Sequence, residues 1–262
     1  MQISLREVGH QTLRVGVRAG DRSRPPLLIF NGIGANIELV APFLAALDGP
    51  EAIVFDAPGV GGSPPPVLPY RPWMLARLTA RLLEQLGHER ADVLGVSWGG
   101  AMAQQFAFQY AARCRRLILA ATSPGHVMIP GHLGALLKMA SPRRYRDPDY
   151  MTRIAGEIYG GAFRRSPELA REHLRHVHWT SDYGYYLQLT AGLGWSSLPW
   201  LPLLPQPTLV IAGNDDPLVR VINGRILASL IPNARLITLD DGHLFLVTSA
   251  DESARVVSEF LT

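Results

Sequence analysis

The residues from Gly95 to Gly99 could supply a nucleophile. They read Gly-Val-Ser-Trp-Gly and lie between an apolar run at 91–94 and a helical pattern that begins at Gly100. A serine on such a tight strand-to-helix turn needs a small residue two positions before it and two positions after it, because the strand and the helix approach closely there. The turn also places the serine at the positive end of the helix. The pattern predicts that Ser97 is a nucleophile and not only a turn residue.

A serine hydroxyl needs a histidine that accepts its proton and an acid that orients this histidine. Among eight histidines, His243 directly follows the last predicted strand, whose carboxyl end lies at the same sheet edge as Ser97. The strand predicted at 208–212 is followed by two adjacent acids, Asp215 and Asp216, whose side chains must point in different directions. We predict that Asp216 orients His243, and that Asp215 caps the turn or meets solvent. The order serine, aspartate, histidine is the one that such a turn requires.

Other acids and histidines have less specific patterns. Asp240 and Asp241 are too close to His243 in the chain to reach its ring from a tight loop, and we predict that they are turn residues. Three histidines are closely spaced at 173–178, but no cysteine or carboxylate completes a metal-ligand set there. We therefore predict no metal site and no organic cofactor.

Two backbone N–H groups are needed to bind the oxygen that becomes negative during acyl transfer. One would come from Trp98, the residue after the serine. The other usually comes from the loop after the third strand, here Asn31-Gly32-Ile33-Gly34. We predict that Ile33 supplies it, with the Asn31 side chain ordering the loop. A phosphate-binding loop would need a lysine or a G-x-G-x-x-G spacing, and this segment has neither.

The surrounding pattern predicts an α/β fold. Alternation at 12–18 is typical of a half-exposed antiparallel strand at a sheet edge. Short, nearly continuous apolar runs are typical of strands covered on both faces, and helical patterns lie between most of them. The strands are expected at 26–30, 52–55, 91–96, 117–121, 208–212 and 236–239, and the helices at 73–86, 100–110, 221–230 and 250–261.

The alternation of strands and helices fails between about Ser123 and Leu201, where aromatic residues gather. We predict a helical cap at 124–201, inserted after the sixth strand, and a core formed by 1–123 and 202–262. Such a cap would cover the carboxyl ends of the strands, where open α/β sheets bind their ligands. Packing is the commoner role for any single aromatic residue. The candidate pocket residues are Asn31, Trp179, Tyr185 and Trp195.

Composition excludes several other classes of protein. With 262 residues, 47% hydrophobic content and a net charge of +3, the chain is an ordinary globular protein whose arginines are scattered, so we expect no nucleic-acid partner. A single cysteine fits a reducing compartment. The first residues lack an apolar segment of signal-peptide length. The most hydrophobic region of the chain, 198–211, is interrupted by prolines. We expect a cytoplasmic protein without a transmembrane span.

The whole pattern resembles the α/β-hydrolase superfamily, with a mostly parallel, doubly covered sheet. Its individual sequence motifs resemble those of the intracellular poly(3-hydroxyalkanoate) depolymerases that act on medium-chain-length storage polyesters. The resemblance covers nearly the full chain and includes segments of the predicted cap, where hydrolases of this superfamily differ in substrate. It is carried by the segments 27–36, 95–101, 103–107, 140–145, 158–161, 191–195 and 241–246.

This resemblance implies a triad of Ser97, Asp216 and His243, a 3-hydroxyacyl-enzyme intermediate, and the release of 3-hydroxyalkanoic acids or short oligomers. It also implies a polyester partner at the surface of a storage granule. Three alternatives stay open: a 3-hydroxyacyl transferase, a generic carboxylesterase, and a binding protein that keeps the fold without catalysis. Dehalogenases and epoxide hydrolases are disfavoured, because they carry an aspartate in place of Ser97. The sequence leaves the oligomeric state open.

Overall fold

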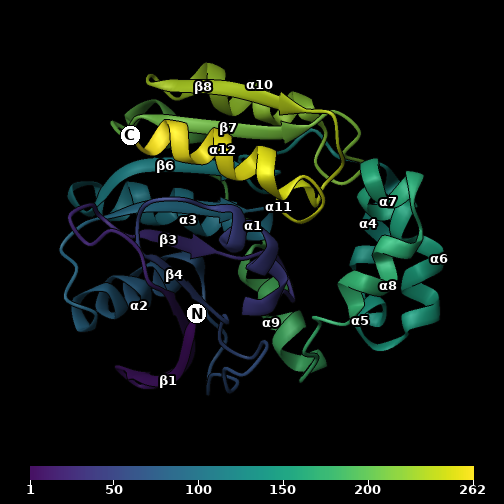
Figure 1. Ribbon diagram of the computed structural model, residues 1–262, viewed down its shortest axis with the longest axis horizontal. Coiled ribbons are helices and arrows are strands. Elements are labelled where there is room, and N and C mark those ends of the chain that lie inside the picture. The colour runs from purple at the N-terminus through teal and green to yellow at the C-terminus, as the bar shows by residue number, and fades with distance from the viewer.

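The computed structural model describes residues 1–262, and its centre is an eight-stranded sheet (Figure 1). The strands follow the order β1-β2-β4-β3-β5-β6-β7-β8 across the sheet. The β1/β2 and β2/β4 pairs are antiparallel, and all other neighbours are parallel. The strands are β1 (Gln2–Val8), β2 (Gln11–Arg18), β3 (Leu27–Phe30), β4 (Ala52–Phe55), β5 (Ala91–Val96), β6 (Cys114–Ala120), β7 (Thr208–Gly213) and β8 (Ala234–Leu239).

The predicted α/β architecture is confirmed, with differences at both edges of the sheet. The strand expected at the edge, β2, lies second, because the unpredicted β1 pairs with its outer side. At the opposite edge, β8 is mostly half-exposed or exposed, so the prediction that this strand is covered on both faces was wrong. An edge strand lacks a neighbour on one side, which leaves room for solvent. The central strands β3, β4, β5 and β7 are fully buried.

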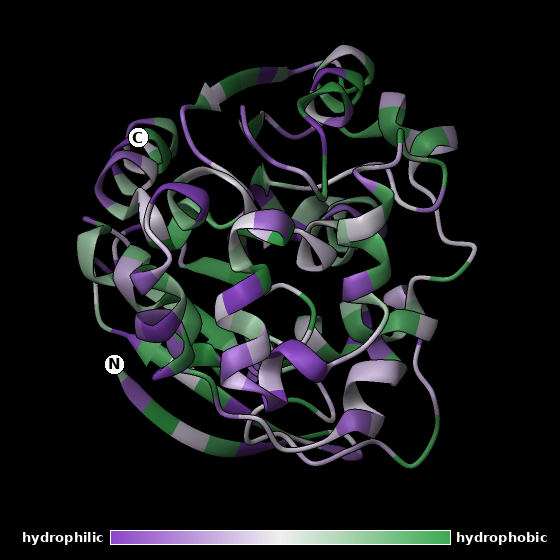
Figure 2. Ribbon diagram, turned by 90° about the vertical axis from the view of Figure 1, so that its right-hand side faces the viewer, coloured by the Kyte–Doolittle hydropathy of each residue, from purple (hydrophilic) through white to green (hydrophobic).

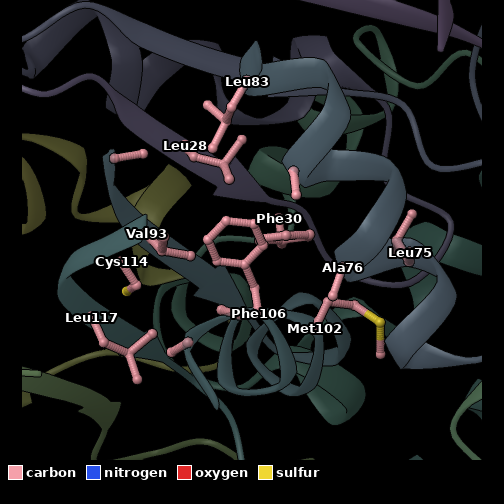
Figure 3. Packing of buried hydrophobic residues seen from close by; sticks show 14 of the residues in the cluster. Leu28, Phe30, Leu75, Ala76, Leu83, Val93, Met102, Phe106, Cys114 and Leu117 are labelled. Carbon is pink, nitrogen blue, oxygen red and sulfur yellow. The ribbon is translucent and has the colours of Figure 1, made fainter. Parts of the chain in front are cut away.

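Helices cover both faces of the sheet. On one face, α2, α3 and α10 pack into a large apolar cluster, and on the other face η1, α1, α11 and α12 pack into a second one. Figure 3 shows the first cluster, in which Phe30 of β3 meets Phe106 of α3 at a centroid distance of 6.1 Å. These elements are η1 (Ile37–Val40), α1 (Ala41–Ala46), α2 (Pro72–Gln85), α3 (Trp98–Gln109), α10 (Val221–Leu230), α11 (Phe245–Thr248) and α12 (Ala250–Leu261), whereas η2 (Ala111–Arg113) lies between α3 and β6.

The insertion between β6 and β7 is helical and contains no strand of the sheet. Figure 1 shows α4 to α8 together, beside the end of the sheet toward which the arrow of β7 points. The predicted cap range 124–201 contains α4 to α9, whereas η3 crosses its last residue. The elements are α4 (Leu133–Met139), α5 (Arg143–Arg146), α6 (Pro148–Tyr159), α7 (Gly161–Arg165), α8 (Glu168–Leu174), α9 (Asp182–Ala191) and η3 (Leu198–Leu203).

The helix α6 illustrates how the insertion folds. The Asp147 carboxylate accepts a hydrogen bond from the N–H of Tyr150 and so caps the helix, and Pro148 occupies its first turn. Apolar residues at positions 151, 154, 155 and 158 form one buried stripe, while the opposite face is polar. The stripe packs into a small hydrophobic cluster formed by the insertion together with Leu218 of the loop after β7. Seen from the insertion side, the helices accordingly alternate between hydrophilic and hydrophobic segments (Figure 2).

The insertion is also packed on the rest of the molecule. Leu187 and Ala191 of α9, with Leu201 of η3, belong to the large cluster on the α2 and α3 face of the sheet. Trp200 of η3 stacks on Phe108 of α3 at a centroid distance of 4.5 Å. The end of the insertion is therefore held by the main core, while α4 to α8 pack chiefly on one another.

Candidate active site

Ser97 lies on a strained turn between β5 and α3. Its φ of 54° and ψ of −117° are rare for a residue with a side chain, and such conformations cost about 1–3 kcal/mol. A β-carbon at Gly95 would lie 2.4 Å from the carbonyl oxygen of Gly99, and one at Gly99 would lie 2.1 Å from that of Phe30. Both glycines are therefore needed sterically, as the sequence pattern predicts.

Gly99→Ala should therefore destabilise the fold by about 3 kcal/mol or more, because its methyl group would meet the backbone of β3, which cannot easily move. The matched control is Gly192→Ala, where the nearest atom would be 3.8 Å from the new carbon. Urea unfolding followed by circular dichroism measures both. Equal midpoints for the two variants would contradict the steric argument.

A chain of hydrogen bonds joins Ser97, His243 and Asp216. The Oγ of Ser97 is 2.9 Å from Nε2 of His243, and Nδ1 of His243 is 2.7 Å from Oδ2 of Asp216. The other carboxylate oxygen of Asp216 accepts hydrogen bonds from the N–H groups of Leu218 and Val219. A proton on Nδ1 directed at this fixed carboxylate leaves Nε2 free to accept the hydroxyl proton of Ser97.

Asp215 and Asp216 point in different directions. Rather than capping its own turn, the Asp215 carboxylate accepts hydrogen bonds from the N–H of Gly161 and from the Arg164 guanidinium, each at 2.7 Å. Both partners belong to α7, within the insertion. Of the two adjacent acids, one therefore holds the histidine and the other holds the insertion against the β7 loop.

The prediction that Asp241 is only a turn residue was wrong. Its side chain is buried and accepts hydrogen bonds from the N–H groups of Ala162 and Gly242 and from the hydroxyls of Thr248 and Ser249. Burial raises the pKa of the Asp241 carboxyl, but these hydrogen bonds outweigh it and hold the pKa below its usual value. Asp241 thus fixes the loop that carries His243, whereas the neighbouring Asp240 is exposed.

Two backbone N–H groups near Ser97 have no acceptor within the protein, namely those of Ile33 and Trp98. The loop that carries Ile33 is firmly held. The Asn31 amide donates to the carbonyl of Asn36 and accepts from the N–H of Gly32, which is the ordering role that the sequence predicts for it. Free, preorganised N–H groups are the feature that stabilises a developing oxyanion.

The insertion also holds this loop in place. Gln188 of α9 accepts a hydrogen bond from the N–H of Gly34 at 2.6 Å, and the Tyr145 hydroxyl donates to the carbonyl of Ile33 at 2.8 Å. The indole of Trp98 donates to the backbone carbonyl of Gln188. Both residues with free N–H groups are therefore tied to helices of the insertion.

A cavity of about 50 Å³ adjoins Ser97 and His243. A cavity of about 10–15 Å³ by this measure already holds one water, so the space accommodates small groups beside the two catalytic side chains. The lining is mostly apolar and comes from both the core and the insertion: Asn31, Gly32, Ile33, Ala35, Leu39, Val40, Val96, Ser97, Met139, Arg144, Tyr145, Tyr159, His173, His243, Leu244, Leu246 and Val247.

Of the four predicted pocket residues, only Asn31 lines this cavity. Trp179 stacks on the Tyr145 ring at a centroid distance of 5.2 Å. Tyr185 is fully buried, and its hydroxyl donates to the carbonyl of Met139. Trp195 donates to the Gln105 side chain and packs against Trp200. These three aromatic residues hold the insertion together and against the core, so their prediction as pocket residues was wrong.

Among the residues of the cavity wall that the sequence prediction missed, three carry polar groups close to the site: Tyr159, His173 and Arg144. Tyr159 stacks on the His243 ring at 6.3 Å, and its carbonyl accepts the N–H of His243. His173 is buried, and burial together with the charges of His176 and Arg144 lowers its pKa to about 4. Arg144 is the third. The signal for Arg144 and Tyr159 was present, because both lie in segments that carry the family resemblance.

Comparison with known proteins places the chain in a family. The family model described as alpha/beta hydrolase fold matches residues 25–250. The chain belongs to the α/β-hydrolase fold family. This α/β-hydrolase is similar to the enol-lactonase from Burkholderia xenovorans LB400, whose structure superposes with a TM-score of 0.84 at 25% identity and covers 98% of this chain and 99% of that one.

The sequence is also similar to those of two curated proteins. The α/β-hydrolase is 56% identical to a poly(3-hydroxyalkanoate) depolymerase from Ectopseudomonas oleovorans over 97% of this chain and 90% of the relative. It is 28% identical to 3-oxoadipate enol-lactonase 2 from Acinetobacter baylyi over 86% of this chain and 84% of that protein. None of the helices in the structure combines the length and the apolar character needed to cross a membrane.

Proposed function

We propose that this α/β-hydrolase is a serine esterase that cleaves the ester bonds of medium-chain-length poly(3-hydroxyalkanoate). The observation that carries the chemistry is the hydrogen-bonded chain Ser97–His243–Asp216. The substrate is supported by the 56% identity to a protein named as a depolymerase of this polymer, and by the mostly apolar cavity wall. Catalysis needs no metal or organic cofactor in this proposal.

The reaction proceeds in two stages. His243 accepts the proton of Ser97 while Oγ attacks the ester carbonyl, and the N–H groups of Ile33 and Trp98 bind the oxyanion. His243 then gives this proton to the departing hydroxyl of the next unit, which leaves a 3-hydroxyacyl-enzyme. In the second stage His243 activates water, which releases a 3-hydroxyalkanoic acid or oligomer. Asp216 keeps the imidazole in the required tautomer throughout.

The architecture fits this role. We assign residues 1–123 and 202–262 to the hydrolase core and 124–201 to a cap over the site. Five residues of this cap line the cavity, so the cap would select the acyl chain: Met139, Arg144, Tyr145, Tyr159 and His173. The site of action in this proposal is the surface of a polyester granule in the cytoplasm.

The test is release of 3-hydroxyalkanoic acids from an amorphous medium-chain polyhydroxyalkanoate emulsion, measured by mass spectrometry beside hydrolysis of p-nitrophenyl butyrate. Soluble acids should appear, at a higher rate per ester bond than with a short-chain polyester. Cleavage of the small ester without attack on the polymer would move the assignment to a generic esterase. Esters formed with an added alcohol acceptor, in preference to free acids, would move it to an acyl transferase.

A further inference from the structure

Arg144 of α5 is a buried cation without an acidic partner. Its side chain is 1% exposed, lines the cavity beside Ser97, and has no carboxylate within ion-pair distance. Its guanidinium donates to neutral oxygens: the hydroxyls of Tyr185 at 2.6 Å and Tyr159 at 3.2 Å, the carbonyl of Ile33 at 3.4 Å and that of Ser141 at 3.5 Å. The last two contacts are long, and none of the four partners carries a negative charge.

Two other arginines of this protein, unlike Arg144, form ion pairs with acidic side chains. Arg14 forms ion pairs with Glu38 and Asp56, and Arg115 forms one with Asp92, although both arginines are more exposed than Arg144. Removing a guanidinium from water is costly unless an opposite charge compensates, and arginine does not escape this cost by losing its proton. The ring faces of two tyrosines near Arg144 offset only part of it.

The cavity contains no anion that could serve as the missing partner. Asp216 is turned away and bonded to His243. His173, the histidine on the cap side, is buried with a pKa lowered to about 4, so it is neutral at pH 7. The one fixed charge that the cap presents to the cavity is therefore positive, and it is held next to the loop that carries the free N–H of Ile33.

We infer that Arg144 binds a carboxylate of the substrate, and, resting on the proposed function, that this carboxylate is the acid end of the polyester chain. The terminal carboxylate is the only ionised group of such a polymer. Planar, bidentate binding of carboxylates is the interaction that a guanidinium makes best. The enzyme then removes units one at a time from the acid end, rather than cutting within the chain.

The chemistry of each cycle restores the recognised group. The bond that breaks joins the carbonyl carbon of the penultimate unit to the 3-oxygen of the last unit. Ser97 Oγ bonds to this carbonyl carbon, and its proton passes through His243 to the 3-oxygen, so the last unit leaves as a 3-hydroxy acid. Water then hydrolyses the acyl-enzyme and leaves a new terminal carboxylate on the shortened chain, which Arg144 binds in the next cycle.

Two matched substrates test this inference. One is the linear dimer of 3-hydroxyoctanoate with a free carboxylate, and the other is the same dimer as its methyl ester; cleavage of the internal ester is followed by mass spectrometry. With the unmodified enzyme, kcat/KM should be about 10- to 100-fold higher for the free acid, as expected for one charge-assisted contact. The difference should lie mainly in KM.

Variants at two adjacent arginines localise the effect. Arg144→Gln should remove the preference, so that the ratio of kcat/KM for the free acid to that for the methyl ester falls to about one, and Arg144→Lys should restore part of this ratio. The matched control is Arg143→Gln, because Arg143 points away, pairs with Asp147 and is largely exposed. It should keep the full preference.

The outcomes separate this inference from the proposed function. Equal kcat/KM for the two dimers with the unmodified enzyme would overturn the role of Arg144 even if its variants do not fold, while the esterase assignment would stand. Cleavage of p-nitrophenyl butyrate without cleavage of either dimer or of polymer would overturn the proposed substrate, and the inference with it.

Discussion

Ser97→Ala should lower the rate of 3-hydroxy acid release by about three to six orders of magnitude. Alanine removes the oxygen that lies 2.9 Å from Nε2 of His243 and that forms the acyl-enzyme. The backbone N–H groups of Ile33 and Trp98 remain, so a residual rate above that of water is expected. The measurement is kcat/KM for polymer and for p-nitrophenyl butyrate, with circular dichroism to verify the fold.

The matched control for this prediction is Ser229→Ala, at a serine of α10 whose hydroxyl bonds only to the carbonyl of Ile226. It should keep the activity of the unmodified enzyme within about twofold. A folded Ser97→Ala protein with more than a tenth of the original activity would disprove the nucleophile assignment. Activity lost on polymer alone would instead point to a second esterase site.

Asp216→Asn should lower kcat by about 10⁴-fold with little change in folding. Asp216 accepts a hydrogen bond at Oδ2 from His243 and is fixed at Oδ1 by two backbone N–H groups. An amide in this position either donates a hydrogen bond to Nδ1, which places the ring proton on Nε2, or fails to stabilise the imidazolium. Either result leaves Nε2 unable to accept the serine proton efficiently.

The adjacent acid supplies the comparison for Asp216. Asp215→Asn changes the same atoms one residue away, but Asp215 contacts Gly161 and Arg164 of α7 and does not touch His243. Its kcat should stay within about tenfold of the unmodified value. If instead Asp215→Asn were the inactive variant and Asp216→Asn the active one, the acid would be misassigned.

Much of the site could be predicted because chain topology positions it. Ser97, Asp216 and His243 are far apart in sequence, yet each follows a parallel strand of one sheet, and the carboxyl ends of such strands meet at one edge. Local patterns were sufficient to find those strands, since the buried ones are continuous apolar runs. Because successive side chains point in different directions, only one of Asp215 and Asp216 could face His243; the family resemblance implies Asp216, and in the structure Asp216 is the one that contacts the ring.

The walls of the cavity could not be derived in this way. The position of the Arg144 guanidinium in the cavity wall depends on partners from the loop after β3, from α6 and from α9. No local sequence pattern encodes how such short helices pack on one another. An aromatic residue has the same signature whether it lines a cavity or fills a gap, which is why Tyr185 and Trp195 were misjudged. The six-residue helix α1 was also missed, because it is too short for a periodic signal.

The segment from Tyr159 to Ala162 connects the cap to both loops that carry the acid and the histidine. Tyr159 accepts the N–H of His243, Gly161 donates to Asp215, and Ala162 donates to Asp241. A β-carbon at Gly242 would lie 1.9 Å from the carbonyl oxygen of Tyr159, so the two backbones are in direct contact there. The acid, the histidine and the cap therefore share one short stretch of backbone, and a substitution that displaces it would disturb the alignment of His243 and Asp216 without touching either residue.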